Sequence, residues 1–339
     1  MLSKEEVLRI LESVIIAGDQ ASLVSKNLVK EVLPKDGAVN IVIADTGLTA
    51  DDKESLKGTI RDAINNNTGF EKLDIIFDII FEETRAADIN RVKNVITVMS
   101  GKGGVGKSLV SGLLAVALRR KGHEVGILDA DIVGPSIPRM FGLSGQLRGF
   151  GKAIVPLESK IGIEVVSMNL LLENECDPVI WRGPIISGAI KQFWEDALWG
   201  SLDDLIVDLP PGTTDASLTV MQSLPITGVI IVTTPQDLVE MIVKKAVNMV
   251  KEMNKPIIGI IENMSYLLLP GTDEKVEIFG RSRVEEVARE IGVPLLGRLP
   301  IDPEIARHCD KGTIELYNSE ILQALEESLI QAMATNKFE

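Results

Sequence analysis

The spacing of apolar residues changes character partway along this chain. In the first 83 residues, apolar positions at helical spacing alternate with short strand-like runs, in the order helix, strand, strand, helix, strand. The five predicted elements span residues 3–16, 27–34, 38–45, 51–66 and 72–83. An Asp-Gly step between the first two strands is typical of a hairpin. The pattern therefore predicts a small α+β domain over residues 1–83, followed by a polar linker over 84–94.

From residue 95 onward, apolar residues form short, nearly continuous runs separated by stretches of helical spacing. The predicted strands span residues 95–99, 125–129, 163–168, 205–208, 228–233, 257–261 and 295–299. Helical patterns fill most of the gaps, as at 107–121 and 237–253. Strands that are apolar throughout and alternate with helices indicate a mainly parallel sheet covered on both faces. We therefore expect an α/β fold over residues 95–339.

Charge and composition narrow the expected partners and compartment. The 339 residues include 35 basic and 49 acidic side chains, for a formal net charge of −14. An acidic chain without a basic face or tail is not typical of proteins that bind DNA or anionic lipid, so neither partner is expected. Two cysteines argue against a disulfide framework, and no apolar run suits a signal peptide or a membrane span. These features predict a cytoplasmic protein.

One glycine-rich stretch has the composition and the context of a phosphate-binding loop. "GKGGVGKS", residues 101–108, fits G-x-x-x-x-G-K-[ST] between a predicted strand and a predicted helix. Its glycines allow backbone N–H groups to surround phosphate oxygens, while Lys107 reaches the β- and γ-phosphates and Ser108 ligates Mg²⁺. The expected nucleotide contacts are Gly101, Lys102, Gly103, Gly104, Val105, Gly106, Lys107 and Ser108. ATP and Mg²⁺ are therefore the expected cofactors.

Two aspartates follow later strands that end at the same edge of the predicted sheet. Asp131 lies just beyond the strand that ends at Asp129, and Asp208 ends the strand before a Pro-Pro-Gly turn. Ligands of open α/β sheets bind at the carboxyl ends of the strands, so both carboxylates should face the phosphate loop. Asp208 suits a Mg²⁺ ligand that acts through a bound water, Asp131 suits orienting the attacking water, and the Gly212 N–H suits a γ-phosphate contact. A strand-end cap is the alternative role for each aspartate.

With its second lysine, the loop resembles that of a known group of ATPases. The loop resembles the deviant Walker A motif, K-G-G-x-G-K-[ST], of the MinD/ParA/NifH-like ATPases, and Lys102 is its extra lysine. The resemblance implies a homodimer in which Lys102 reaches the partner's nucleotide and joins Lys107, Asp131 and Asp208 as a catalytic group. A second cation at that place stabilises charge that develops on the transferring phosphoryl group. A solvated lysine in a polar loop is the alternative.

Longer stretches resemble the Mrp/ApbC branch of that group, the iron–sulfur cluster carrier ATPases. They are "DADIVGPSIPRMFG", "VIWRGP", "LIVDLPPGTTD" and "IIGIIENMSY", and the similarity runs from about residue 94 to the C-terminal region. The resemblance implies that Asn263 contacts the adenine, that residues 299–306 close over the base, and that apo iron–sulfur proteins are clients. Residues 1–83 resemble the PaaD/SufT-like domain often fused in front of these ATPases.

The thiol ligands of that branch are absent from this sequence. In the family, a C-x-x-C follows the E-N-M-S-Y stretch, and two protomers together hold a bridging cluster. Here the stretch reads "ENMSYLLLPGTDEKVEIFG", and the small domain also lacks the cysteine that often follows its second strand. Cys176 and Cys309 lie far apart without a chelating spacing. No iron–sulfur ligands are therefore assigned.

The sequence as a whole predicts a homodimeric, Mg²⁺-dependent ATPase of the iron–sulfur cluster carrier family, acting in cluster assembly or transfer. Two alternatives stay open. One is a non-cluster scaffold that uses nucleotide-driven closure to hold a protein client. The other is a positioning or partition ATPase of the MinD/ParA type, which needs a basic C-terminal helix or a basic surface, whereas this chain ends "NSEILQALEESLIQAMATNKFE".

Overall fold

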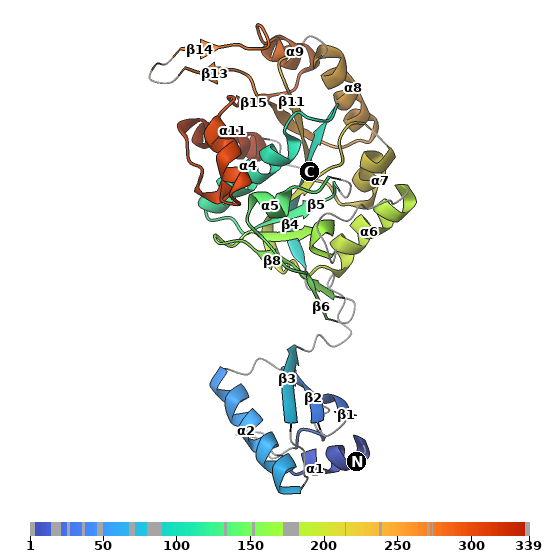
Figure 1. Cartoon of the computed structure of the whole chain (residues 1–339). Helices are drawn as coiled ribbons and strands as arrows, with labels where there is room; N and C mark the ends of the chain where they lie inside the picture. The colour runs from blue at the N-terminus through green and yellow to red at the C-terminus, as the bar shows by residue number, and fades with distance from the viewer. Residues whose placement is uncertain are drawn as a thin grey trace. The chain divides into compact units, whose positions relative to one another are not determined.

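The chain folds as two compact units, residues 1–83 and 84–339, each with its own hydrophobic core (Figure 1). The computed structural model describes residues 4–14, 22–25, 28–35, 38–45, 50–67, 72–79, 90–131, 134–150, 153–171, 183–213, 215–236, 239–269, 272 and 274–335. The boundary between the two units, after residue 83, coincides with the end of the last strand predicted for the small domain.

In the described residues of the N-terminal unit, two helices accompany a three-stranded sheet. Its elements are α1 (Lys4–Leu11), β1 (Val29–Lys35), β2 (Ala38–Asp45), α2 (Ala50–Asn67) and β3 (Lys72–Ile79). β1 and β2 pair antiparallel, as the hairpin signal indicated, and β3 lies parallel to β2. Apolar residues of both helices, such as Val7 and Ile60, are buried with Ile41 of β2. Helix α1 ends at Leu11, short of the expected residue 16, because the chain turns after it.

An eight-stranded sheet forms the middle of the C-terminal unit. Its spatial order is β15–β12–β11–β4–β10–β5–β9–β8, and every neighbouring pair is parallel except β8 with β9. The strands are β4 (Arg91–Ser100), β5 (Val125–Asp129), β8 (Leu157–Glu158), β9 (Glu164–Ser167), β10 (Ser201–Asp208), β11 (Gly228–Thr233), β12 (Ile257–Glu262) and β15 (Leu295–Arg298). All residues of β5 and β11 are buried, as continuous apolar runs require of central strands. The predicted α/β class with a mainly parallel sheet is confirmed.

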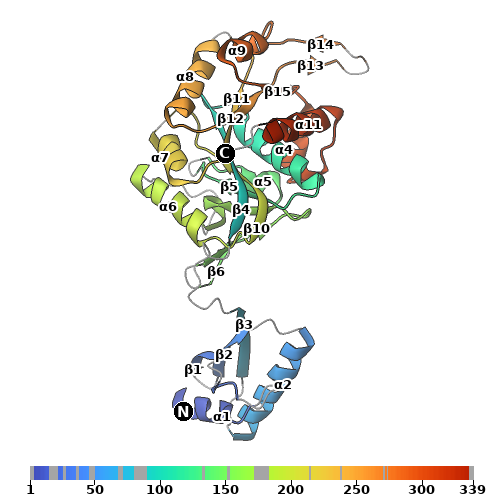
Figure 2. The same ribbon diagram turned by 180° about the vertical axis from the view of Figure 1, so that it is seen from behind.

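Helices cover both faces of this sheet. They are α4 (Lys107–Arg120), α5 (Ile137–Met140), α6 (Gly183–Asp196), α7 (Asp215–Ser223), α8 (Val239–Glu252), α9 (Val284–Ile291), α10 (Pro303–Asp310) and α11 (Glu320–Thr335), with 3-10 turns η1 (Met168–Leu171) and η2 (Ile314–Leu316). Helices α4 and α11 lie on one face, and α6, α7 and α8 lie on the other (Figures 1 and 2). Since α4 packs against both the sheet and α11, ten of its fourteen residues are buried.

The linker was predicted over residues 84–94, but β4 already begins at Arg91, so the predicted linker extends too far. Parallel pairing with β10 starts at Arg91 opposite Ser201. Polar side chains at this end of the strand find partners across the sheet, and Lys93 Nζ lies 2.6 Å from Asp203 Oδ1. Because these partners provide hydrogen bonds and ion pairs for the polar side chains, this polar stretch of sequence forms the first part of the strand. The remainder of the expected linker, residues 84–89, lies outside the described residues.

Two short ribbons and one edge strand have no counterpart among the predicted elements. They are β6 (Arg148–Phe150) with β7 (Ala153–Val155), β13 (Leu267–Leu268) with β14 (Lys275–Val276), and the antiparallel edge strand β8. Elements of two or three residues are too short to show a period of their own.

The apolar face of α11 is buried in the C-terminal unit. Leu322, Leu325 and Leu329 are buried, and the helix packs on α4 and β15. Since the sheet and α4 occupy that face, it is not displayed as the apolar face of a membrane-targeting helix would be. Among the residues that the structure describes, no helix has the length and apolar character needed to cross a bilayer.

Candidate nucleotide-binding site

The glycine-rich loop joins the end of β4 to the start of α4, as the sequence predicted. Gly106 precedes the first turn of α4 with φ 78°, a left-handed backbone that glycine adopts without strain. A Cβ atom at this position would lie 2.2 Å from Nδ2 of Asn263. On the other side of the loop, a Cβ atom at Gly101 would lie 2.1 Å from the Ile242 side chain of α8. At both glycines, therefore, a larger residue would force its neighbours to move.

Lys107 and Asp208 form a buried ion pair at the carboxyl edge of the sheet. Lys107 Nζ lies 2.7 Å from Asp208 Oδ1, and the two side chains are 5% and 0% exposed. Ser108 Oγ donates to Asp208 Oδ2 at 2.5 Å, and Ser111 Oγ donates to Oδ1 at 2.7 Å. The structure thus brings together Lys107 and Ser108, at the start of α4, with Asp208, at the end of β10, as the motif predicted. Oxygen ligands of this kind fit Mg²⁺.

Two carboxylates, those of Asp129 and Asp131, lie at and just beyond the end of the neighbouring strand β5. Asp129 is fully buried, and it accepts a hydrogen bond from Ser167 Oγ at 3.1 Å and one from the Asp131 N–H at 3.2 Å. Burial, followed by the charge of Asp208, raises the pKa of Asp129 to about 8. Burial also raises the pKa of Asp131, which is only partly buried. Asp131 is therefore a more basic carboxylate than an exposed aspartate.

We expect Asp129→Asn to stabilise the chain progressively as pH rises from about 4 to 8. The folded chain keeps the Asp129 proton up to about pH 8, whereas the unfolded chain releases it near 3.8, the ordinary pKa of the side chain. In this window the unfolded state binds fewer protons, so wild-type stability falls with rising pH. The variant should gain up to roughly 1.4 kcal/mol per pH unit relative to wild type. Urea unfolding at pH 5 and pH 8 measures this gain, with exposed Asp62→Asn as the control; an equal difference at both pH values contradicts it.

Lys102 contacts its own chain in this structure. Its ammonium group donates to Gln236 Oε1, which follows the end of β11, and its carbonyl accepts from Ser100 Oγ at 2.9 Å. The side chain is partly exposed, and its ammonium group pairs with Gln236, whereas Lys107 pairs with Asp208. The structure therefore places the second lysine at the rim of the loop.

Asn263 lies directly against the phosphate loop. Its side-chain amide donates to the Val105 carbonyl at 3.0 Å, and its N–H donates to the Thr233 carbonyl at 2.8 Å. It is 2% exposed. The position at the carboxyl end of β12 agrees with a place beside the nucleotide, and adenine contact stays a prediction.

Gly212 lies in the turn after β10, with φ 80°. Ser217 Oγ of α7 donates to the carbonyls of Gly212 and Pro210, both at 3.1 Å. These bonds tie the turn to the start of α7. The γ-phosphate contact of the Gly212 N–H stays a prediction.

Sequence reasoning missed three residues of this site: Ser111, Asp129 and Gln236. Ser111 follows Lys107 by four positions, so it shares the helix face that meets Asp208. That spacing was visible in the sequence. The contact between Lys102 and Gln236 had no such signal, because it joins residues 134 positions apart.

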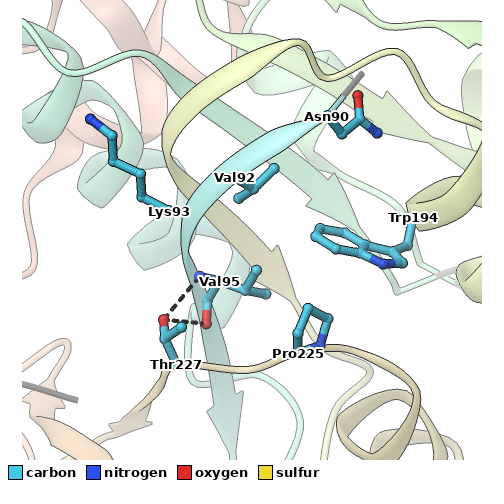
Figure 3. A pocket seen from close by; sticks show the side chains of 7 residues that line it. All are labelled: Asn90, Val92, Lys93, Val95, Trp194, Pro225 and Thr227. Carbon is cyan, nitrogen blue, oxygen red and sulfur yellow. Dashed lines mark hydrogen bonds between the residues drawn. The ribbon is translucent and has the colours of Figure 1, made fainter. Parts of the chain in front are cut away.

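A separate cavity of about 350 Å³ lies at the other end of β4, away from the phosphate loop (Figure 3). It is lined by Asn90, Val92, Lys93, Val95, Trp194, Pro225 and Thr227. Asn90 uses its amide for the Ala197 carbonyl and the Gly200 N–H, and Thr227 Oγ1 bonds the Val95 backbone. Their polar atoms therefore stabilise the start of the strand, and the cavity is not part of the nucleotide site.

The residues present do not fit an iron–sulfur cluster. The segment after Asn263 forms the β13–β14 hairpin, and the exposed large apolar side chains in and just after it are Leu268, Val276, Ile278 and Phe279. Cys309, the one cysteine among the described residues, is half-buried, and burial raises the pKa of its thiol. No three His, Cys, Asp or Glu side chains gather to hold a metal within the described part of the chain. Cys176 lies outside the described residues.

The fold and the phosphate loop together define a P-loop NTPase of the MinD/ParA type. The chain resembles the cell division ATPase MinD of Pyrococcus furiosus in fold, with 20% identity, a TM-score of 0.52, and 70% of this chain and 99% of that one covered. A nucleotide-binding protein from Archaeoglobus fulgidus, solved in complex with ADP, is 40% identical, with a TM-score of 0.62 and coverage of 68% and 91%.

The family can be stated more narrowly. The family model described as NUBPL iron-transfer P-loop NTPase matches residues 91–335, and the chain belongs to this family. The iron–sulfur cluster carrier protein of Clostridium perfringens is 48% identical, covering 68% of this chain and 83% of its own length. The iron–sulfur cluster carrier protein of Synechocystis is 38% identical, covering 92% and 91%, so its similarity includes the N-terminal unit. The chain is thus a nucleotide-binding P-loop NTPase of the iron–sulfur cluster carrier family.

Proposed function

We propose that this chain binds Mg²⁺·ATP and hydrolyses it as a cytoplasmic homodimer that serves iron–sulfur protein maturation. The observation that carries the proposal is the buried group formed by Lys107, Ser108 and Asp208 beside the glycine loop. Without nucleotide, the Lys107 ammonium neutralises Asp208. With nucleotide, Lys107 exchanges this partner for phosphate oxygens, and Ser108 and Asp208 become free to hold Mg²⁺ directly or through water.

Each residue then has a part in hydrolysis. Water attacks the γ-phosphorus, the bond to the β-phosphate oxygen breaks, and ADP and inorganic phosphate leave. Asp131 orients the water, and Lys107 and the loop N–H groups bind the phosphates. Mg²⁺ supplies charge neutralisation on the phosphate oxygens. Asn263 reaches the base, and the Gly212 N–H contacts the γ-phosphate.

The homodimer supplies a second cation. Among the described residues, the Lys102 ammonium group contacts Gln236 and the Lys102 carbonyl contacts Ser100. In the dimer it leaves Gln236 and reaches the γ-phosphate bound to the partner, where it stabilises the charge that develops during transfer. Hydrolysis and dimer formation are then one event, and the clients are apo iron–sulfur proteins.

A stable bridging cluster is not part of this proposal. The hairpin that follows Asn263 contains no thiol, and a leucine or proline cannot donate a ligand to iron. This observation favours one second candidate, a scaffold that uses nucleotide-driven closure to hold a protein client without carrying a cluster itself.

We expect anaerobic reconstitution with iron and sulfide to leave the purified chain without a stable cluster. The four thiolates that a bridging [4Fe–4S] cluster needs are absent, so iron and sulfide should separate from the protein on desalting. Iron and sulfide analysis with visible spectroscopy measures the outcome. A variant with Leu269→Cys and Thr272→Cys places a C-x-x-C in the same hairpin and serves as the matched control. About four irons per wild-type dimer, retained after desalting, contradicts the expectation.

A further inference from the structure

A fully buried carboxylate next to Asn263 organises the end of β12. Glu262 is 0% exposed, and both of its oxygens have partners. Ser282 Oγ donates to Oε1 at 2.7 Å, Arg298 Nε donates to Oε2 at 3.2 Å, and Ser265 Oγ also donates to Oε2. A buried carboxylate is stable only when a cation and donors surround it in this way. We call Glu262, Ser265, Ser282 and Arg298 the Glu262 network.

The Glu262 network holds both ends of the β13–β14 hairpin. Ser265 lies just before β13, and Ser282 follows β14. Arg298 also reaches the hairpin itself, since its second guanidinium nitrogen lies 2.9 Å from Glu277 Oε1. Its guanidinium carbon lies 5.9 Å from the ring centre of Tyr266. One arginine thus connects strand β15, strand β12 and the hairpin.

The same network lies one residue from the nucleotide site. Met264 separates Asn263 from Ser265, and its backbone has φ 55°, an uncommon conformation for a residue with a side chain. Backbone bonds hold the two sides of this residue. The Leu299 N–H donates to the Glu262 carbonyl, and the Ser265 N–H donates to the Leu299 carbonyl, both at 2.8 Å. Such a conformation persists only where the surroundings fix it.

We propose that Glu262 and Arg298 are positioning residues that fix the Met264 backbone, hold Asn263 against the phosphate loop, and couple nucleotide binding to the order of the β13–β14 hairpin. This inference rests on nucleotide binding at the proposed site. Asn263 contacts the Val105 carbonyl inside the loop, so a nucleotide that fills the loop acts on Asn263 directly. The rigid link from Asn263 to Ser265 then carries that change to the hairpin.

Coupling of this kind is reciprocal. If a bound nucleotide orders the hairpin, then loosening the hairpin weakens nucleotide binding by the same factor. A merely structural role for Arg298 lowers stability and predicts no such correspondence. The two quantities to compare are therefore nucleotide affinity and hairpin amide exchange.

The test uses the full chain with the nonhydrolysable analogue Mg²⁺·AMP-PNP. In wild type, the analogue should slow amide exchange over residues 265–282. Arg298→Ala should weaken analogue binding at least about 5-fold, and should make hairpin exchange fast and independent of the analogue. Arg298→Lys retains the cation and should recover part of both effects. Arg289→Ala, which removes an exposed arginine of α9, is the charge-matched control and should behave as wild type.

A milder variant guards against misfolding, because Arg298→Ala leaves Glu262 buried without its cation. Glu277→Gln loosens only the outer contact of Arg298, so the buried part of the network remains. It should raise hairpin exchange and weaken analogue binding by a matching, smaller factor. Faster exchange with unchanged affinity overturns the inference. If wild type itself binds no analogue, the proposed function fails instead, so the two failures are distinguishable.

Discussion

Lys107→Met is expected to abolish nucleotide binding, with affinity lowered by at least about 100-fold. In the proposed function Lys107 is the cation that meets the β- and γ-phosphates, and each hydrogen bond to a charged group contributes about 1.5–3 kcal/mol. Methionine keeps the length of the side chain and removes only the ammonium group. Isothermal titration with Mg²⁺·ATP or Mg²⁺·AMP-PNP measures the loss. Exposed Lys160→Met is the control and should bind as wild type does.

The same variant should lose stability without nucleotide, by about 3–5 kcal/mol, because it leaves Asp208 buried and unpaired. Adding Asp208→Asn should restore most of this stability but not the binding. The double variant therefore separates loss of the phosphate contact from loss of the fold. Wild-type affinity in Lys107→Met, or in the restored double variant, contradicts the assignment of this lysine.

Lys102→Ala is expected to retain nucleotide binding and to lose turnover by about 100-fold or more. Removal of one preorganised group that stabilises transition-state charge costs that much in other active sites. Binding is spared because Lys102 lies at the rim of its own loop, outside the group formed by Lys107, Ser108 and Asp208. Phosphate release under saturating Mg²⁺·ATP gives the turnover number, and titration with the analogue gives the affinity.

Gln236→Ala is the matched control for this variant. It removes the partner of Lys102 within the same chain and leaves the lysine in place. If the catalytic position of Lys102 is on the partner's nucleotide, Gln236→Ala should keep wild-type turnover or exceed it. Undiminished turnover in Lys102→Ala refutes the role across the dimer.

The spacing of apolar residues predicted the central strands well, because strands packed on both faces of a parallel sheet have nearly continuous apolar sequences. Strands β5 and β11 are buried along their whole length, so their sequences are apolar without interruption. The start of β4 was missed because polar residues such as Lys93 and Asn94 find partners on β10. Such partners belong to another segment of the chain, and a local pattern does not contain them.

The candidate site likewise has features that the sequence predicted and features that it did not. The glycine loop and the two strand-end aspartates were visible because each sits at a fixed place relative to a strand. The ion pair between Lys107 and Asp208 was not predicted, since it depends on how closely β10 approaches α4. The Glu262 network was also beyond the sequence, because its members lie on three separate segments that meet only in the folded chain.

The hairpin after Asn263 lacks the cysteines of the family to which the chain belongs. Family membership rests on residues 91–335, whereas the missing cysteines concern a single hairpin within that range. The structure keeps this hairpin attached to β12 and β15 through Arg298. A hairpin without thiols is therefore still attached to the strands that end beside Asn263.

The most direct test of the account is a crystal structure of the full chain with Mg²⁺·AMP-PNP. Two chains should face each other across their phosphate loops, with the partner's Lys102 Nζ about 3 Å from a γ-phosphate oxygen. Lys107 should have left Asp208 for the nucleotide in both subunits. An analogue bound to a chain whose Lys102 still contacts its own Gln236, with no second subunit opposite, would contradict the account.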